Sequence, residues 1–124
     1  MTEHVIPFPA VNPVDLVFGP DGNVWFTQFR GSRIAKMSIA GEFIFQEDTP
    51  TAEAGPAGIE VGPDNQIWFT ELKGNKIGRI TNDGKISEYS IPIAGGPLDI
   101  AKGRNNELWF TLVAANKIGR ISLG

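Results

Sequence analysis

One unit of about 42 residues occurs three times in this chain, and this repeat limits the possible folds more than any other feature. The triplet Trp-Phe-Thr recurs after steps of 43 and then 41 residues, at residues 25–27, 68–70 and 109–111. A proline opens each copy, and a basic, apolar segment follows each triplet. The prolines are Pro13, Pro56 and Pro97, and the segments are residues 33–37, 76–80 and 117–121. A period of this size indicates that one supersecondary unit is stacked several times.

Each copy reads as short strands separated by turn residues. The triplets are rich in aromatic and β-branched side chains, which strands favour, and residues 76–81 alternate polar and apolar. Gly-Pro-Asp-Gly at residues 19–22 is a tight-turn signal, because proline presets φ and glycine accepts a positive φ. No window shows a sustained helical period. Four strands in about 42 residues is the size of a β-propeller blade, so the sequence predicts an all-β chain of four-stranded antiparallel blades.

The copies divide the chain into one propeller segment with three blades. Blade 1 is expected at residues 10–50, blade 2 at 51–92 and blade 3 at 93–124. Blade 3 stops before its own outer strand, while residues 3–7 (EHVIP) resemble residues 88–92 (EYSIP) of an outer strand. Residues 1–9 are therefore expected to form a strand that closes a blade. The ring is then completed by missing blades or by oligomerisation, and we favour a six-bladed homodimer that exchanges this strand.

Composition narrows the class of protein. Hydrophobic residues make up 41% of the 124 residues, charged residues 20%, and the net charge is −3. This balance is typical of a globular domain and disfavours nucleic-acid binding, which needs a basic surface. No apolar run approaches the length that crosses a membrane, and no cysteine is present for disulfides or thiolate chemistry. We expect a cytoplasmic protein with no membrane or nucleic-acid partner.

The repeat resembles that of the streptogramin (virginiamycin B) lyases. The resemblance rests on Gly-Pro-Asp-Gly-x-x-Trp-Phe-Thr, on Asn-Lys-Ile-Gly-Arg-Ile at residues 75–80, and on Gly-x-Ile-x-Glu-Tyr-x-Ile-Pro at residues 84–92. It implies a share of a seven-bladed propeller whose family opens the lactone ring of type B streptogramins by elimination, assisted by magnesium. In that family the work is done by histidines in a Pro-His-x-Ile segment at the start of the innermost strand, with nearby glutamates.

The histidine positions of that pattern are occupied by other residues here. They hold Val14, Ala57 and Leu98, and the sole histidine, His4, lies in the segment expected to form an outer strand. Elimination beside a carbonyl needs a positioned base and an acid, and none of these three side chains moves a proton. We therefore expect a non-catalytic binding or scaffold module without a cofactor. The alternative is a streptogramin lyase, or a fragment of one, which would use magnesium.

Candidate ligand residues follow from strand direction. Antiparallel strands place the loops between blades and the ends of the Trp-Phe-Thr strands on one face, beside the channel. The residues expected there are Asp15, Asp99, Gln28, Arg30, Glu71 and Lys73. A ring of acids beside a channel could hold a divalent cation or a hydroxyl-rich ligand, or the aspartates could instead cap loop amides. The three tryptophans are expected between blades, and the repeated Lys and Arg positions are expected on a solvated strand face.

Overall fold

The computed structural model describes all 124 residues and contains only strands and loops. Its eleven strands form three antiparallel sheets, which confirms the predicted all-β class. Blade 1 contains β1 (Pro13–Phe18), β2 (Val24–Gln28), β3 (Arg33–Met37) and β4 (Phe43–Asp48). Blade 2 contains β5 (Pro56–Val61), β6 (Ile67–Glu71), β7 (Lys76–Ile80) and β8 (Ile86–Ser90). Blade 3 contains β9 (Pro97–Lys102), β10 (Glu107–Leu112) and β11 (Lys117–Ser122).

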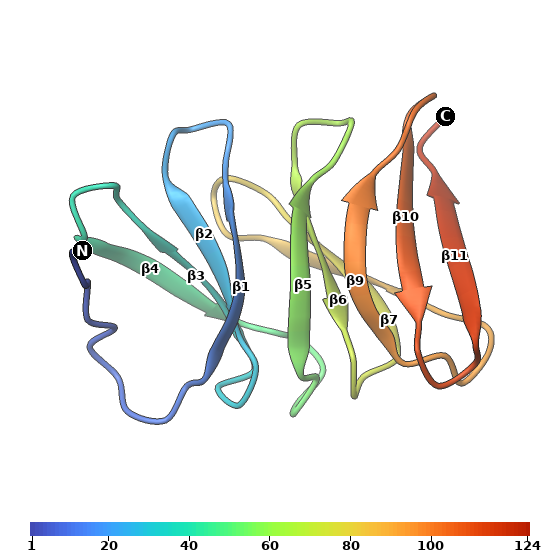
Figure 1. Ribbon diagram of the computed structural model, residues 1–124, viewed down its shortest axis with the longest axis horizontal. Coiled ribbons are helices and arrows are strands. Elements are labelled where there is room, and N and C mark those ends of the chain that lie inside the picture. The colour runs from blue at the N-terminus through green and yellow to red at the C-terminus, as the bar shows by residue number, and fades with distance from the viewer.

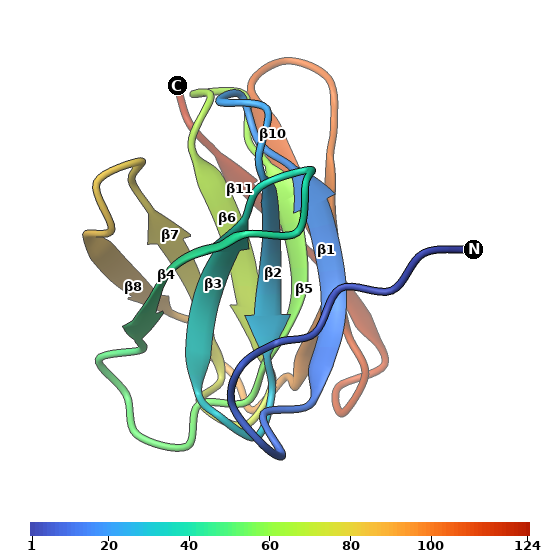
Figure 2. The same cartoon turned by 90° about the vertical axis from the view of Figure 1, so that its left-hand side faces the viewer.

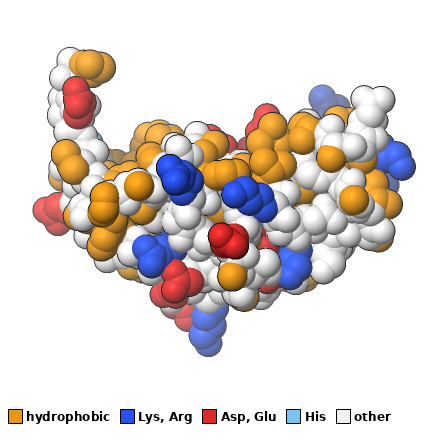
Figure 3. Space-filling view, turned by 90° about the horizontal axis from the view of Figure 1, so that it is seen from below, with side chains coloured by type: hydrophobic (Ala, Val, Ile, Leu, Met, Phe, Trp, Pro, Cys, Tyr) orange, Lys and Arg blue, Asp and Glu red, His pale blue; other side chains and the backbone are white.

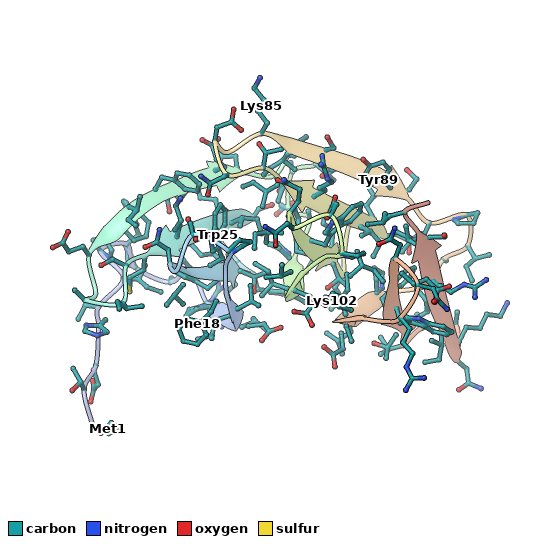
Figure 4. The ribbon with its side chains drawn as sticks, turned by 90° about the horizontal axis from the view of Figure 1, so that it is seen from above. Met1, Phe18, Trp25, Lys85, Tyr89 and Lys102 are labelled. Carbon is teal, nitrogen blue, oxygen red and sulfur yellow. The ribbon has the colours of Figure 1, made fainter.

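The three blades stand side by side in chain order, with β1, β5 and β9 as neighbours (Figure 1). Seen from above, they form an arc whose concave side carries Phe18 and Lys102 and whose convex side carries Lys85 and Tyr89 (Figure 4). The N-terminus lies at one end of the arc and the C-terminus at the other (Figure 1). No helix of a length and apolarity that would cross a membrane is present.

Each blade has two unlike faces because side chains alternate along a strand. We call the side that carries the triplet tryptophan the Trp face, and the side that carries the triplet phenylalanine the Phe face. Between blades 1 and 2, Trp25 and Ile34 pack against Ile59, Ile67 and Phe69. The corresponding side chains pack between blades 2 and 3, where Trp68 and Ile77 meet Ile100, Leu108 and Phe110. The two larger core clusters are thus the two junctions, each a Trp face on a Phe face.

The threonine of each triplet ties neighbouring blades together through hydrogen bonds. The Thr27 hydroxyl accepts from the Asp15 N–H within blade 1 and donates to the Ala57 carbonyl of blade 2 at 2.9 Å. The Thr70 hydroxyl likewise donates to the Leu98 carbonyl of blade 3 at 2.8 Å. Both threonines are fully buried, so each hydroxyl satisfies main-chain groups that water does not reach.

The two ends of the arc leave one face of each kind without a neighbouring blade. The Phe face of blade 1 exposes Leu16 and Phe18, and the Trp face of blade 3 exposes Trp109 and Ile118. Figure 3 shows hydrophobic side chains gathered toward both ends of the arc. A tryptophan was expected between blades in every copy, and this holds for the first two but not for Trp109, because no blade follows it.

The segment before β1 forms no strand within a single chain, although residues 1–9 were expected to close a blade. Figure 2 shows this segment passing in front of the open face of blade 1. Ile6 packs against a cluster of Phe26, Ala35 and Met37 on that face, and the Phe8 ring meets Phe43 edge-on at 5.4 Å. Pairing with a last blade stays a prediction that concerns a second chain.

The close fit of a glycine against an aromatic ring allows a direct test of the junction between blades 1 and 2. A Cβ on Gly78 would lie 2.1 Å from the ring of Phe69, which is fully buried. Gly78→Ala is therefore expected to lower the free energy of unfolding by about 1–3 kcal/mol through overpacking. Urea denaturation checks this against Lys85→Ala, an exposed turn residue. Equal midpoints for the two variants would contradict the packing described.

Candidate functional site

The loops between blades and the ends of the Trp-Phe-Thr strands meet on one face, as strand direction predicted. The Phe29 N–H donates to the Asn12 carbonyl, and the Leu72 N–H donates to the Gly55 carbonyl, both at 2.9 Å. The same bond recurs in blade 3. These bonds fix the loop before each innermost strand against the end of the second strand. This face, called the loop face below, carries the candidate ligand residues.

The two aspartates of the loop face are bonded to main-chain groups. One Asp15 carboxylate oxygen accepts the Leu16 N–H at 2.9 Å, and the other accepts the Ile59 N–H of blade 2 at 3.1 Å. One Asp99 oxygen accepts the Ile100 N–H at 2.9 Å. These contacts are those of aspartates that cap loop amides, and not those of cation or ligand binding. Asp15 in particular spans the junction of blades 1 and 2.

Gln28 and Glu71 occupy equivalent positions and are both fully buried, so neither reaches a ligand on the surface. The buried Gln28 amide has no hydrogen-bond partner in the chain. Both residues belong to the Phe faces of their blades, since each lies two residues beyond the triplet phenylalanine.

Glu71 shares its surroundings with a second carboxyl, that of Glu88 on β8. Burial first, and then the hydrogen bond and negative charge of Glu88, raise the pKa of Glu71 to about 8. Burial acts on Glu88 in the same direction, but the hydrogen bonds from Glu71 and Thr51 outweigh it and lower the pKa of Glu88. The Thr51 hydroxyl donates to Glu88 at 2.9 Å, and the Lys76 ammonium lies 3.7 Å from the same carboxylate. The pair therefore carries one proton near neutral pH, held by Glu71.

Arg30, Lys73 and Asp99 are the exposed members of the candidate set. The Lys73 ammonium lies 5.2 Å from the centre of the Phe29 ring, so this side chain reaches across from blade 2 to blade 1. Arg30 forms no ion pair within the chain. These three charged side chains are the candidate residues that stay accessible to a molecule on the loop face.

The residues of this face do not fit a magnesium ion. Magnesium takes oxygen ligands in near-octahedral geometry, usually from one or two carboxylates with water or substrate. Asp15 is engaged with two amides, and Glu71 is protonated and buried. No group of three or more His, Cys, Asp or Glu side chains converges anywhere in the chain in a way that could hold a metal. We therefore derive no step through a metal.

The repeated basic positions are not the uniformly solvated strand face that was expected. Lys36 is buried, lies 4.7 Å from the centre of the Trp25 ring and donates to Asp21 at 3.0 Å. Arg79 sits over Trp68 in the same way and pairs with Asp64 at 3.0 Å. These cations pack on the tryptophans, and the expectation was wrong because alternation alone does not show that a neighbouring indole covers the strand.

The turn aspartates complete this arrangement. Burial acts to raise the pKa of Asp21, but hydrogen bonds from Asn23, Trp25 and Lys36 outweigh it and lower the pKa. Asp64 also has a lowered pKa, because bonds from Trp68 and Arg79 outweigh its burial. Sequence reasoning treated these residues as turn formers only. The signal available was their fixed distance of four residues before each tryptophan.

These features define a class of protein: a segment of a β-propeller built from Trp-Phe-Thr blades, with the loops between blades gathered on one face. The model of the Virginiamycin B lyase family matches residues 1–124, and the chain belongs to that family. This agrees with the resemblance read from the repeat.

Known relatives are considerably longer than this chain. A catalytically inactive histidine-to-alanine variant of virginiamycin B lyase from Staphylococcus aureus, solved with quinupristin, is 38% identical with a TM-score of 0.94. The alignment covers 99% of this chain and 42% of that one. A streptogramin B lyase structure is 41% identical with a TM-score of 0.93, and 41% of it is covered. The virginiamycin B lyase of Saccharopolyspora erythraea is 42% identical over 40 residues, 32% of this chain and 13% of that one. This chain therefore spans about two fifths of the solved relatives.

The raised pKa of Glu71 predicts a pH-dependent stability. Between its ordinary value of 4.5 and about 8, the folded chain keeps a proton that the unfolded chain releases. The free energy of unfolding therefore falls as pH rises through this range, by at most about 1.4 kcal/mol per pH unit from this group. Glu71→Gln, which copies Gln28 of blade 1, is expected to remove that slope in urea titrations between pH 5 and 8. Glu42→Gln, on an exposed turn, serves as the control, and an unchanged slope in Glu71→Gln would contradict the assignment.

Proposed function

We propose that this chain is a non-catalytic binding or scaffold module built from the lyase repeat. The observation that carries the proposal is the identity of the residues at the start of β1, β5 and β9. Val14, Ala57 and Leu98 stand where the lyase pattern has histidine, and none of them accepts or donates a side-chain proton. The inactivity of a histidine-to-alanine variant in the Staphylococcus aureus relative is consistent with the need for such a residue.

The surroundings of these three positions support the same conclusion. The Ala57 and Leu98 carbonyls accept hydrogen bonds from Thr27 and Thr70, so the segment serves the contact between blades. The one buried acid of the chain is Glu71, whose pKa is raised to about 8 by burial and then by Glu88, so this carboxyl keeps its proton near neutral pH and is not exposed to a ligand. General acid–base catalysis needs a group within hydrogen-bond reach of the substrate.

The exposed charges of the loop face are the contacts that we propose for a small molecule. Arg30, Lys73 and Asp99 are exposed on this face, while Asp15 caps the Ile59 amide and Gln28 and Glu71 are buried. Such a surface suits a polar ligand with both hydroxyl and anionic groups. A ligand on this surface would be bound, but no base is positioned to remove a proton from it.

The alternative is a lyase, or a segment of one, that opens the lactone of type B streptogramins. It is favoured by the 38–41% identity with solved relatives, of which the chain spans about two fifths. In that case further blades would supply the acid and the base. A lyase of this kind would acquire activity only together with those blades.

Incubation of the purified chain with virginiamycin B and magnesium tests whether this chain opens the lactone by itself. We expect no ring-opened product by mass spectrometry, because no imidazole stands at the start of an innermost strand. A full-length virginiamycin B lyase under the same conditions is the positive control. Accumulation of the linear product by this chain alone would overturn the non-catalytic assignment and direct attention to Asp15, Asp99 and Glu71.

A further inference from the structure

The two open ends of the arc are the two halves of a contact that the chain already makes twice. Trp109 is 40% exposed, whereas the equivalent Trp25 and Trp68 are 1% and 3% exposed. Ile118 is 64% exposed, whereas Ile34 and Ile77 are 0% and 1%. At the other end, Leu16 is exposed where its equivalents in blades 2 and 3 are buried. Each end lacks the type of face that the other end presents.

The polar groups of the junction repeat this pattern. The Thr111 hydroxyl accepts the Asp99 N–H at 3.0 Å, as its two equivalents do in their own blades, but it has no acceptor beyond. Those equivalents donate to the Ala57 and Leu98 carbonyls of the following blade. The main-chain position that corresponds to both acceptors is Val14, at the opposite end of the same chain. A second copy placed after blade 3 would bring that carbonyl to Thr111.

Blade 3 also contains an asparagine at the position that holds the loop between blades 2 and 3. Asn75 ties the loop after β8 to blade 2, since its amide donates to the Ile93 carbonyl at 2.7 Å and its oxygen accepts the Gly95 N–H at 3.0 Å. Asn116 occupies the same place in blade 3 and has the same backbone conformation, with φ of 56° against 57° for Asn75. The Asn116 side chain, unlike that of Asn75, makes no hydrogen bond in this structure.

The N-terminal loop already has the shape of a loop between blades. Ala10 and Asn12 have φ of 55° and 58°, and the equivalent Glu53 and Gly55 between blades 1 and 2 have 51° and 62°. The Val11 carbonyl accepts the same pair of N–H groups from its own blade that the equivalent carbonyl accepts in blade 2. In both internal junctions the residues before such a loop form the outer strand of the preceding blade. Residues 1–5 therefore correspond in position to the outer strand of the preceding blade in each internal junction.

A groove of about 620 Å³ runs along the free edge of β11, where the outer strand of blade 3 would lie. It is mainly apolar, with Ile91, Ile118 and Leu123 among its lining residues. An exposed strand edge beside an apolar groove is a template for an added strand. Ile6 of an added strand would pack against the core beside blade 3, because its equivalent Ile91 packs against the core between blades 2 and 3.

We propose that residues 1–5 of a second copy pair with β11, and that the Phe face of its blade 1 covers the Trp face of blade 3. The inference does not depend on the proposed function. The repeat sets the register, since Glu88 faces Gly78 and Tyr89 faces Ile77 in blade 2. Glu3 of the second copy would therefore face Gly119, and His4 would face Ile118. The contact is made reciprocally, so two copies related by a two-fold axis close a ring of six blades.

The number of copies follows from the range of known rings. Propellers usually contain four to eight blades, and chains of three blades reach six with two copies but about nine with three. A closed pair also leaves no free Trp face, no free Phe face and no unpaired β11 edge. An open chain of copies would keep all three at its ends.

One feature of the proposed junction differs from the internal ones. At the innermost strands, blades 1 and 2 bring together Asp15 and Gly58, and blades 2 and 3 bring together Gly58 and Asp99. The junction between copies would instead bring Asp99 beside Asp15 of the second copy. Two carboxylates at such a contact repel each other, so the junction between copies is weaker than the two within a chain.

A pair of introduced cysteines tests the register, since the natural chain has none. His4→Cys with Ile118→Cys places the thiols opposite each other only across the proposed junction, because antiparallel partners have Cβ atoms about 4.5–5.5 Å apart. Mild oxidation is expected to give a covalent dimer of about 27 kDa, twice the 13.4 kDa chain, on a non-reducing gel. His4→Cys with Ser122→Cys, about 13 Å apart in this register, is the control and is expected to remain monomeric on the gel. A ladder of higher multimers, or equal cross-linking of both pairs, would overturn the proposal.

Light scattering tests the assembly without cross-links. The unmodified chain is expected as a dimer, and Ile118→Lys as a monomer with a dissociation constant raised by at least about 100-fold, because the charge would be buried in the junction. Ile118 is exposed in a single chain, so the variant keeps its fold. Ile44→Lys, an exposed position on β4, is the matched control and should leave the dimer intact. A monomeric unmodified chain, or equal effects of both lysines, would contradict the exchange.

Removal of one charge gives a test in the opposite direction. Asp99→Asn keeps an oxygen for the Ile100 N–H and removes the repulsion from Asp15 of the second copy. The dissociation constant is expected to fall about tenfold. Asp83→Asn, which removes a carboxylate from an exposed turn of the central blade, should leave the constant unchanged. A weaker dimer for Asp99→Asn would contradict the predicted meeting of the two innermost strands.

Discussion

The packing of a Trp face on a Phe face is the interaction on which the rest of this structure depends. A single blade is a thin sheet with apolar side chains on both sides, and it cannot bury them alone. Trp25 and Trp68 become buried only because another blade follows each of them. Burial of such a side chain contributes about 2–3 kcal/mol, so the junctions, and not the individual blades, are the units of stability.

The repeat allowed the fold to be predicted because it fixes both the strand pattern and the blade boundaries. Proline, turn, triplet and basic segment recur in one order, and the structure places them on β1, β2 and β3 and their equivalents. What the repeat could not show is which side chains cross a junction. The capping of the Ile59 amide by Asp15 joins residues 44 positions apart, and the Lys36 contact with Trp25 depends on a register that alternation does not specify. The loop-face set therefore separated into capping, buried and exposed members.

Polar groups within the junctions make this packing specific. The triplet threonines, the turn aspartates and Glu88 each bond to a defined partner, so a blade shifted by one residue would leave them unsatisfied. The same residues account for the absence of lyase chemistry in our proposal, since the titratable groups near the channel serve the fold. Family membership thus reflects the shared blade, while function depends on the few positions at the start of the innermost strands.

Hydrogen–deuterium exchange at β11 tests most directly whether the open junction is filled by a second copy. In a single chain, one edge of residues 117–122 faces water, and its amides exchange quickly. If residues 1–5 of another copy pair with that edge, these amides should be protected to the same degree as residues 76–80, which are flanked by strands on both sides. Exchange as fast as that of the turn at residues 104–106, at concentrations used for light scattering, would contradict the account.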